Sequence, residues 1–423
     1  MHHVVIAGAG LAGVACAHEL GRKGFDVHLI DRNDYHQFQP LLYQIATSQL
    51  PAEDVARPLA AIFAKLPNVR VVQDEIIGMD LAARSVTVRS GAEYVSDYLV
   101  LAAGACANFF GTPGAEQHSF PLYSVADAER LRRHVRGVLE GTAGSTDVVV
   151  VGGGPTGVET AGAFAELFKA LRTMKHRGGE AEVHLVNHGK ALLAPFSERS
   201  HVYAFDKLTA HGVNVKLGVG VTSVGADGVQ LSDGSTLTTQ TAIWAGGESA
   251  SPIAHGCGPT TGRGGRLDAA ADLTIEGYPG VYAIGDVANI PGPDGAPLPQ
   301  LGSVAQQSGV WAAHNIEREA AGHNRKPFHY KDKGIMAMIG RGAAIAEVGA
   351  HRHQLEGPLA FAAWLGVHAS LLSGAHSKVD AFMSWAWDYF DRDHAAIVEC
   401  HGDPKRIVWG DDRKPTIDAA ASS

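Results

Sequence analysis

Near its N-terminus the chain reads Val4-Val5-Ile6-Ala7-Gly8-Ala9-Gly10-Leu11-Ala12-Gly13, an apolar run that leads into Gly8, Gly10 and Gly13. The pattern predicts a buried β-strand, a tight turn and a helix that begins against the strand. Glycines at these spacings let the backbone approach a pyrophosphate, and the new helix N-terminus offers N–H groups to its oxygens. A tight turn without a ligand is the alternative, because one such motif is weak by itself.

The same pattern occurs a second time, where Val148-Val149-Val150-Val151 runs into Gly152-Gly153-Gly154-Pro155-Thr156-Gly157. Gly152, Gly154 and Gly157 take the places of the three glycines of the first copy. Two copies in the same strand–turn–helix context predict an α/β chain with two Rossmann-like dinucleotide-binding domains. One enzyme would then bind two dinucleotides.

The first copy has the features of a flavin nucleotide site. The strand expected at residues 26–30 ends at Asp31, next to Arg32, and an acid at such a strand end binds ribose hydroxyls. A later apolar run ends at the small-residue turn around Gly104, which suits close approach to a cofactor. We therefore assign the three glycines of the first copy, Asp31, Arg32 and Gly104 to an FAD site.

A further contribution to this site is expected from Gly280-Val281-Tyr282-Ala283-Ile284-Gly285-Asp286, a short buried strand that ends in Gly-Asp. The Asp286 carboxylate can accept a hydrogen bond from a ribityl hydroxyl. An ordinary helix N-cap is the alternative, since Val287-Ala288 could open a helix, and both roles can hold together. Val304, farther along, is assigned to the same site.

We assign the second copy to the nicotinamide nucleotide by elimination. Gly246, at the end of a later strand, is assigned to the same site. The strand at 183–187 ends at Asn187, where a carboxylate would bind the ribose 2′-OH and repel a 2′-phosphate. Asn187, followed by His188 and Lys190, removes that repulsion and supplies possible donors. This favours NADPH or acceptance of both NADH and NADPH; a surface loop with incidental basic residues is the alternative.

Composition supports a globular enzyme. The chain has 423 residues, 45% hydrophobic and 19% charged, and a net charge of −9 that argues against a nucleic-acid partner. Four scattered cysteines disfavour dithiol chemistry, and the 22 histidines show no convincing metal spacing. Because the first strand begins at Val4, we expect no signal peptide and a cytoplasmic location.

These landmarks predict four segments. An FAD-binding domain begins over residues 1–119, is interrupted by an NAD(P)H-binding domain over 120–255, and resumes over 256–325. Residues 326–423 form a C-terminal region in which we expect amphipathic helices.

The chain resembles the type II NADH dehydrogenases, single-subunit flavoenzymes that reduce membrane quinones without pumping protons. The resemblance lies in residues 31–47 (DRNDYHQFQPLLYQIAT), 154–159 (GPTGVE) and 333–341 (KGIMAMIGR), and in the pattern from Trp364 to Tyr389. It implies a glutathione-reductase-like arrangement of the FAD and NAD(P) domains, followed by a region that associates with membrane or dimerises. It also implies hydride transfer from NAD(P)H to FAD, and then two electrons to a quinone.

The resemblance also places catalytic residues. Glu159 would lie at the nicotinamide–flavin contact, to orient the carboxamide or relay protons; a solvated residue in the first helical turn is the alternative. Glu166, on the same helix face, is expected to be structural. The family has two glutamines four residues apart at the quinone, and here Gln307 keeps the second position whereas Ser303 replaces the first. The shorter serine would admit a different acceptor or weaken quinone binding.

The C-terminal region does not identify the electron acceptor. Residues 357–375 contain no Asp, Glu, Lys or Arg, and we interpret them as a surface-lying or hairpin segment. An apolar stripe follows, from Val379 to Phe390. It suits peripheral membrane contact on the cytoplasmic face, a homodimer interface, or packing on the chain's own core. We expect a homodimer. A soluble NADPH-dependent flavin reductase for a non-respiratory acceptor is therefore the second hypothesis. A nucleotide-sensing redox-binding protein is the third.

Overall fold

The computed structural model describes residues 2–141, 144–174, 180–254, 256–349 and 352–371. Its first domain is built on a parallel five-stranded sheet in the order β21-β9-β1-β2-β5. The strands are β1 (His3–Ala7), β2 (Asp26–Asp31), β5 (Val69–Gln73), β9 (Tyr98–Leu101) and β21 (Val281–Ala283). The central strands β1 and β9 are apolar and buried, as strands covered on both faces of a parallel sheet must be.

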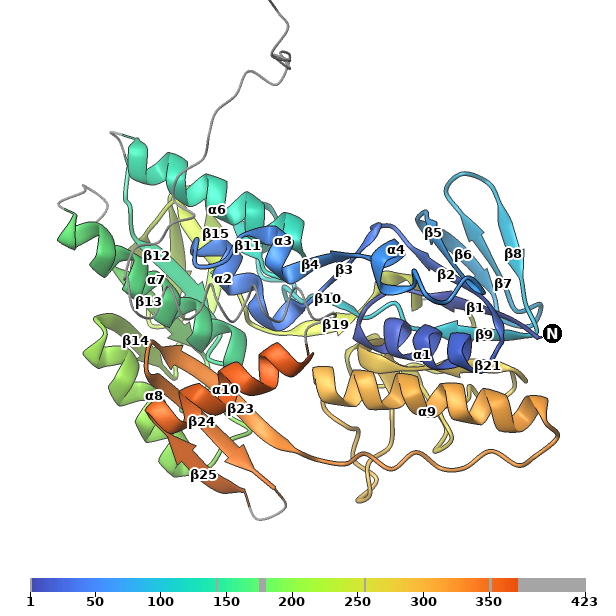
Figure 1. Ribbon diagram of the computed structural model, residues 1–423. Coiled ribbons are helices and arrows are strands. Elements are labelled where there is room, and N and C mark those ends of the chain that lie inside the picture. The colour runs from blue at the N-terminus through green and yellow to red at the C-terminus, as the bar shows by residue number, and fades with distance from the viewer. Residues whose placement is uncertain (1, 142–143, 175–179, 255, 350–351, 372–423) are drawn as a thin grey trace, which may run out of the picture.

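Two long helices cover one face of this sheet side by side, α1 (Leu11–Arg22) and α9 (Gly302–Ala320) (Figure 1). They approach closely because Gly309 lies against the Ala12 backbone, where a Cβ atom would overlap the Ala12 carbonyl. A three-stranded antiparallel sheet, β6-β7-β8, flanks the domain. Its remaining elements are α4 (Leu59–Ile62), β6 (Ile76–Asp80), β7 (Ser85–Val88), β8 (Glu93–Val95), η4 (Arg263–Gly265), β20 (Leu267–Asp268), η5 (Gly285–Val287) and β22 (Ala288–Asn289).

The second domain repeats the arrangement with a parallel five-stranded sheet in the order β11-β18-β12-β13-β14. Its strands are β11 (Ser119–Pro121), β12 (Val148–Val151), β13 (Val183–Asn187), β14 (Val213–Leu217) and β18 (Thr241–Trp244). The other elements are α5 (Ala115–His118), α6 (Val125–Glu140), α7 (Pro155–Thr173), α8 (Glu198–Ala210), β15 (Val221–Gly225), β16 (Gly228–Leu231) and β17 (Thr236–Thr238). In both sheets the central strand leads directly into a glycine turn and a helix, as predicted.

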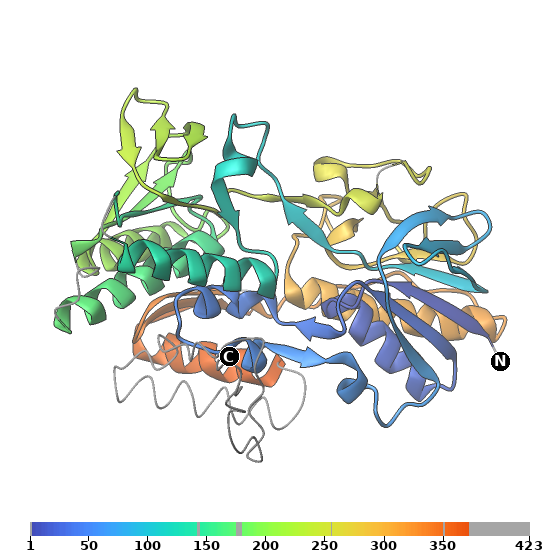
Figure 2. The ribbon, with the colours of Figure 1, turned by 90° about the horizontal axis from the view of Figure 1, so that it is seen from above.

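The two domains are joined by backbone pairing and by a segment that leaves the first domain, packs on the second and returns (Figure 2). Strands β10 (Ala105–Ala107) and β19 (Glu248–Ala250) pair antiparallel between them, and η3 (Pro252–Ala254) follows. The chain leaves the first domain through β3 (Tyr35–Gln37), forms η1 (Gln39–Leu41), α2 (Leu42–Ala46) and α3 (Ala52–Val55), and returns through β4 (Ala56–Pro58). Although the sequence-based division assigns α2 to the FAD domain, its buried side chains share a hydrophobic core with α6 and α7.

The described part of the C-terminal region begins with a sheet, which the expectation of amphipathic helices did not include. Strands β23 (Gly334–Gly340), β24 (Ala343–Val348) and β25 (His353–Glu356) form an antiparallel sheet, followed by α10 (Pro358–Leu371). The sheet packs on α7, where Gly162 leaves room for the Ile339 carbonyl. No helix among the described residues is long and apolar enough to cross a membrane. The stripe predicted between residues 379 and 390 lies outside the described residues.

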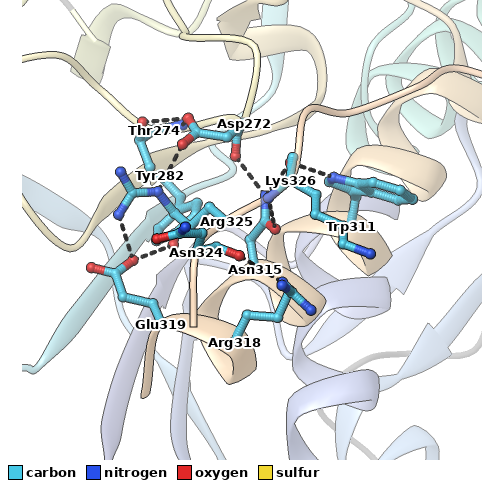
Figure 3. Close-up of polar contacts among 10 residues, drawn as sticks. All are labelled: Asp272, Thr274, Tyr282, Trp311, Asn315, Arg318, Glu319, Asn324, Arg325 and Lys326. Atoms are coloured by element: carbon cyan, nitrogen blue, oxygen red, sulfur yellow. Dashed lines mark hydrogen bonds and ion pairs between the residues drawn. The ribbon is translucent and has the colours of Figure 1, made fainter. Parts of the chain in front are cut away.

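Polar contacts hold the connection between α9 and β23 against the first domain (Figure 3). Asn315 Nδ2 donates to the carbonyls of Asp272 and Lys326 at 3.0 and 2.9 Å. Arg325 forms ion pairs with Asp272 and Glu319 at 2.7 and 3.1 Å. The contacts fix the direction in which the chain leaves α9 and so place β23 beside the second domain.

Candidate active site

One cleft of about 2180 Å³ is lined by both glycine turns. It brings together most of the residues assigned from the sequence. These are Gly8, Gly10, Asp31, Arg32, Gly104, Gly152, Gly154, Glu159, Asn187, His188, Gly246, Asp286, Ser303 and Gln307. Residues separated by up to three hundred positions therefore face a single space, because the carboxyl ends of both parallel sheets open toward it.

The three other assigned residues have different positions. A Cβ atom on Gly13 would overlap the Gly8 carbonyl, and one on Gly157 would overlap the Gly152 carbonyl. These two glycines therefore allow each helix to begin tightly against its turn and do not line the cleft. Val304 is buried in the core of the first domain, at 3% exposure, and its side chain does not line the cleft either.

The ends of β2 and β13 are built alike, although one carries an acid and the other an amide. Asp31 accepts from the amide of Ala9 at 2.7 Å, and Asn187 Oδ1 accepts from the amide of Gly153 at 3.1 Å. Asn187 Nδ2 donates to the carbonyls of Ala191 and Gly189 at 2.9 and 3.2 Å. The Asn187 amide group therefore organises its own loop, while its neighbour His188 is exposed at the rim of the cleft.

Asp286 lies at the boundary of the domains. Its side chain is half-buried, and its buried Oδ1 atom has no hydrogen-bond partner among the described residues. Burial raises the pKa of Asp286 to about 6, against the opposing charge of Arg266. No helix opens at Val287-Ala288, where the structure has a 3-10 turn followed by β22, so the N-cap alternative is wrong. A buried, unpartnered carboxyl oxygen beside the cleft fits a hydroxyl-bearing cofactor chain.

Glu248 is a second, half-buried acid of the cleft that sequence reasoning missed. It lines the cleft from β19, and the Tyr123 hydroxyl donates to its Oε2 atom at 3.3 Å. Burial, and then the charge of Asp286, raise the pKa of Glu248 to about 7. The available signal was its position directly after Gly246-Gly247, at the end of a buried strand.

Glu159 is buried in the cleft wall, at 8% exposure, so the alternative of a solvated residue is wrong. Its Oε1 atom accepts from the Met338 amide of β23 at 3.1 Å. Burial raises the pKa of Glu159 to about 8, against the opposing effect of hydrogen bonds from Met338 and Trp364. A carboxyl group with such a pKa exchanges protons near neutral pH, which suits acid–base work.

Beside Glu159 are two ring side chains, Trp364 and His368, which the sequence analysis includes in the family pattern but to which it gives no role at the site. His368 of α10 lines the cleft and stacks on Trp364, with ring centroids 3.9 Å apart. Its Nδ1 lies 2.8 Å from the Trp364 carbonyl, which can only accept, so Nδ1 carries the proton. Because burial lowers the pKa of His368 to about 4, the ring is neutral at pH 7 and Nε2 is an acceptor.

Ser303 and Gln307 face the cleft from the first turns of α9. The Ser303 and Tyr330 hydroxyls are 2.8 Å apart. Gln307 binds the backbone of Lys331 twice, donating to its carbonyl at 3.1 Å and accepting from its amide at 3.0 Å. Both residues thus hold the segment that leads into β23, in addition to facing the cleft.

Replacing Gln307 by leucine should slow reduction of the electron acceptor about ten-fold, or by about 1.4 kcal/mol, because the two hydrogen bonds that hold the Lys331 backbone beside the cleft are lost. Flavin reduction by the nicotinamide nucleotide should change little. Stopped-flow spectroscopy of the two half-reactions measures both rates. Equal loss in both would contradict a specific role at the acceptor.

The described cysteines offer no dithiol. Cys16, Cys106 and Cys257 form no disulfide, and Cys400 lies outside the described residues. Cys16 is fully buried, and burial raises the pKa of its thiol well above the ordinary range. No group of three metal-ligating side chains is found in the described part of the chain.

The fold and the cleft define an oxidoreductase that binds two nucleotides, and residues 2–309 match the family described as pyridine nucleotide-disulphide oxidoreductase. The chain is 35% identical over 421 residues to the type II NADH:quinone oxidoreductase NdhA of Mycobacterium tuberculosis, covering 92% of this chain and 88% of the relative. It is 30% identical over 354 residues to the type II NADH:quinone oxidoreductase of Staphylococcus aureus, covering 80% and 87%. The protein belongs to the type II NADH:quinone oxidoreductase family.

Solved structures support the fold. The structure of NDH2 from Plasmodium falciparum in complex with NADH has a TM-score of 0.85 and 18% identity, covering 93% of this chain and 99% of that one. The sulfide:quinone oxidoreductase of Aquifex aeolicus has a TM-score of 0.75 and 18% identity, covering 93% and 96%. The predicted α/β architecture and the predicted family are confirmed.

Proposed function

We propose that the protein is an FAD-dependent NAD(P)H:quinone oxidoreductase that does not pump protons. The observation that carries this proposal is the single cleft, into which both glycine turns, Glu159, Ser303 and Gln307 all face. The relatives named as NADH:quinone oxidoreductases support the choice of acceptor.

The residues present fit the two nucleotides. Gly8 leaves no room for a side chain beside the Ala102 carbonyl, and Asp31 and Asp286 offer carboxyl oxygens to ribose and ribityl hydroxyls. The second turn offers Gly152 and Gly154 to the nicotinamide nucleotide. When bound, the flavin accepts a hydride and passes two electrons on. Glu159 holds a proton at its carboxyl group close to this exchange.

An anaerobic stopped-flow experiment tests the proposal. The holoenzyme is mixed with NADH or NADPH and flavin bleaching is followed, and the reduced enzyme is then mixed with a short-chain quinone. Fast bleaching followed by fast reoxidation supports the proposal. Fast bleaching with slow reoxidation by quinone, and fast reoxidation by a soluble aromatic acceptor, would support the second hypothesis, which the serine at position 303 in place of the family's glutamine favours. Slow turnover with every acceptor would support a nucleotide-sensing protein.

For the nucleotide, we propose acceptance of NADPH as well as NADH. The strand end at Asn187 carries no charge that would repel a 2′-phosphate, and His188 is exposed beside it.

Asn187→Glu should lower the ratio of kcat/KM for NADPH to that for NADH by about ten-fold, because a carboxylate repels the 2′-phosphate and accepts from the 2′-OH. Separate steady-state titrations with the two nucleotides measure this ratio. Asn187→Gln is the matched control, since it lengthens the side chain equally without adding a charge. An unchanged ratio in Asn187→Glu would refute the assignment of this strand end.

We also propose peripheral membrane contact on the cytoplasmic face, through α10. Its described exposed side is apolar, with Leu359 at 75% and Val367 at 41% exposure, and residues 357–371 carry no Asp, Glu, Lys or Arg. Co-sedimentation with lipid vesicles tests this contact. A homodimer is the other proposed use of the same face, and sedimentation velocity without lipid distinguishes the two.

A further inference from the structure

The loop between β10 and α5 carries two adjacent phenylalanines that point in different directions. Phe109 turns inward and packs on Trp244, with ring centroids 5.6 Å apart. Phe110 turns outward, where it lines the main cleft with a side chain that is 65% exposed. A single exposed apolar side chain is ordinary on a protein surface, so this exposure indicates nothing by itself.

The backbone of Phe110 is strained as well. Its φ is +51°, in the left-handed region, where the Cβ atom of any residue other than glycine crowds the backbone. Strained residues persist only where their surroundings hold them, and they gather at ligand-binding positions. An exposed aromatic ring that is held on a strained backbone at the wall of a cleft therefore points to a ligand.

The loop is held from both domains. The Phe110 amide donates to Asn108 Oδ1 at 2.9 Å, which fixes the turn. Asn108 is fixed in turn by the second domain, because Trp244 Nε1 donates to its carbonyl at 2.7 Å and its amide donates to the Gly247 carbonyl at 3.0 Å. The ring is thus in place before a ligand arrives, and little has to be ordered on binding.

The position of the ring indicates which part of a ligand it borders. A Cβ atom on Gly247 would lie 2.9 Å from Phe110 Cζ, so the ring lies against the segment that follows β18. Strands β18 and β13 flank the central strand β12 on opposite sides. A dinucleotide crosses such a sheet at the glycine turn after its central strand, with one half on each side. Asn187 at the end of β13 is assigned to the adenosine half, so Phe110 borders the nicotinamide half.

We propose that Phe110 is a binding residue for the nicotinamide nucleotide, with its ring packed on the nicotinamide riboside. The inference rests on the proposed function, which assigns that nucleotide to the second glycine turn. A flat aromatic ring covers the riboside and excludes water from it without adding a charge. NADH and NADPH share this half, so the ring should contribute equally to the binding of both, in contrast to Asn187.

Three variants separate the ring from the loop that holds it. Phe110→Asn removes the ring and preserves the loop, because asparagine is among the residues that adopt a positive φ most readily. Phe110→Tyr keeps an aromatic ring at the same place. Phe205→Asn is the matched control, since Phe205 is an exposed aromatic residue of α8 that does not line the cleft.

Titration calorimetry of the oxidised holoenzyme measures binding of two probes. One is a redox-inactive tetrahydro derivative of NADH, and the other is ADP, which carries the adenosine half alone. The Kd of the NADH derivative should rise at least about ten-fold in Phe110→Asn and remain at the wild-type value in Phe110→Tyr and Phe205→Asn. The Kd of ADP should be unchanged in all three variants.

Steady-state kinetics gives a second readout. In Phe110→Asn the KM for NADH and the KM for NADPH should rise together, so that the ratio of kcat/KM for the two nucleotides stays at the wild-type value. A change in this ratio would contradict a contact with the half that the two nucleotides share.

Wild-type affinity for the NADH derivative in Phe110→Asn would overturn the inference. An equal loss of ADP affinity would overturn it too, because the ring would then not act on the nicotinamide half. Failure of the wild-type protein to reduce any quinone would instead overturn the proposed function. Calorimetry needs no turnover, so the two failures are distinguishable.

Discussion

Glu159→Gln is expected to slow quinone reduction by about 100-fold, the size of effect typical of a lost general acid or base. Glutamine keeps the oxygen that accepts from Met338, so the wall of the cleft should remain in place. Flavin reduction by the nicotinamide nucleotide should be slowed far less, because a hydride transfer needs no proton from the protein. Stopped-flow rates of the two half-reactions separate these effects.

The pH profile provides a second measurement of the same group. In the proposed reaction the protonated form of Glu159 is the donor, and burial raises its pKa to about 8, so the rate of quinone reduction should fall as pH rises through 8. The glutamine variant should lose this ionisation. Glu276→Gln, at an exposed turn residue, is the control and should keep both the rate and the profile. A wild-type profile in Glu159→Gln would show that another group supplies the proton.

Stability should depend on the same carboxyl group. The raised folded-state pKa of Glu159 means that its contribution is fully present below the ordinary value of 4.5 and is lost as pH rises through about 8. The unfolding free energy of Glu159→Gln should therefore decline less than that of the wild type between those limits.

Gly13→Ala should remove most of the bound flavin, and Gly157→Ala should weaken the nicotinamide nucleotide while leaving the flavin in place. In each, the new Cβ atom overlaps the carbonyl of the first glycine in the same turn, Gly8 or Gly152, so the turn that cradles a pyrophosphate must open. We expect at least about a ten-fold loss of the nucleotide concerned, which corresponds to about 1.4 kcal/mol. Flavin absorbance of the purified protein and the KM for NADH measure the two losses.

A third glycine is the control for this pair. Gly137 lies in α6 with open space where a Cβ atom would stand, so Gly137→Ala should keep both nucleotides. If Gly157→Ala released the flavin and Gly13→Ala did not, the assignment of the two turns would have to be exchanged. Retention of both nucleotides by both variants would show that the turns do not hold them.

Much of the site was predictable because its main parts are local. A β-branched run, a glycine turn and a helix follow one another within about fifteen residues, and the acid or amide at the next strand end returns to the turn. Asp31 and Asn187 both accept from a turn amide for this reason. Asn187 Nδ2 also donates to the carbonyls of Gly189 and Ala191. These two hydrogen bonds depend on the path of the loop, so the sequence did not predict them.

Other parts could not be predicted because they depend on contacts between distant segments. Glu248 has a raised pKa because the fold buries it and brings the charge of Asp286 beside it, against the lowering effect of the hydrogen bond from Tyr123. The burial of α2 in the second domain depends on the excursion of the chain between β3 and β4. A sequence pattern describes each segment's own periodicity and carries no information about which distant surface covers it.

The amino-acid sequence by itself determined the two dinucleotide-binding units, their order and the family to which the chain belongs, because short-range glycine geometry and strand–helix alternation require no distant partner. Only the tertiary structure decided the protonation state of the groups that we propose for catalysis. β23 and α10, from about 180 to 210 residues farther along, pack on α7 and exclude water from Glu159. The pKa of a carboxyl group follows from its surroundings, and those are assembled only when the chain folds.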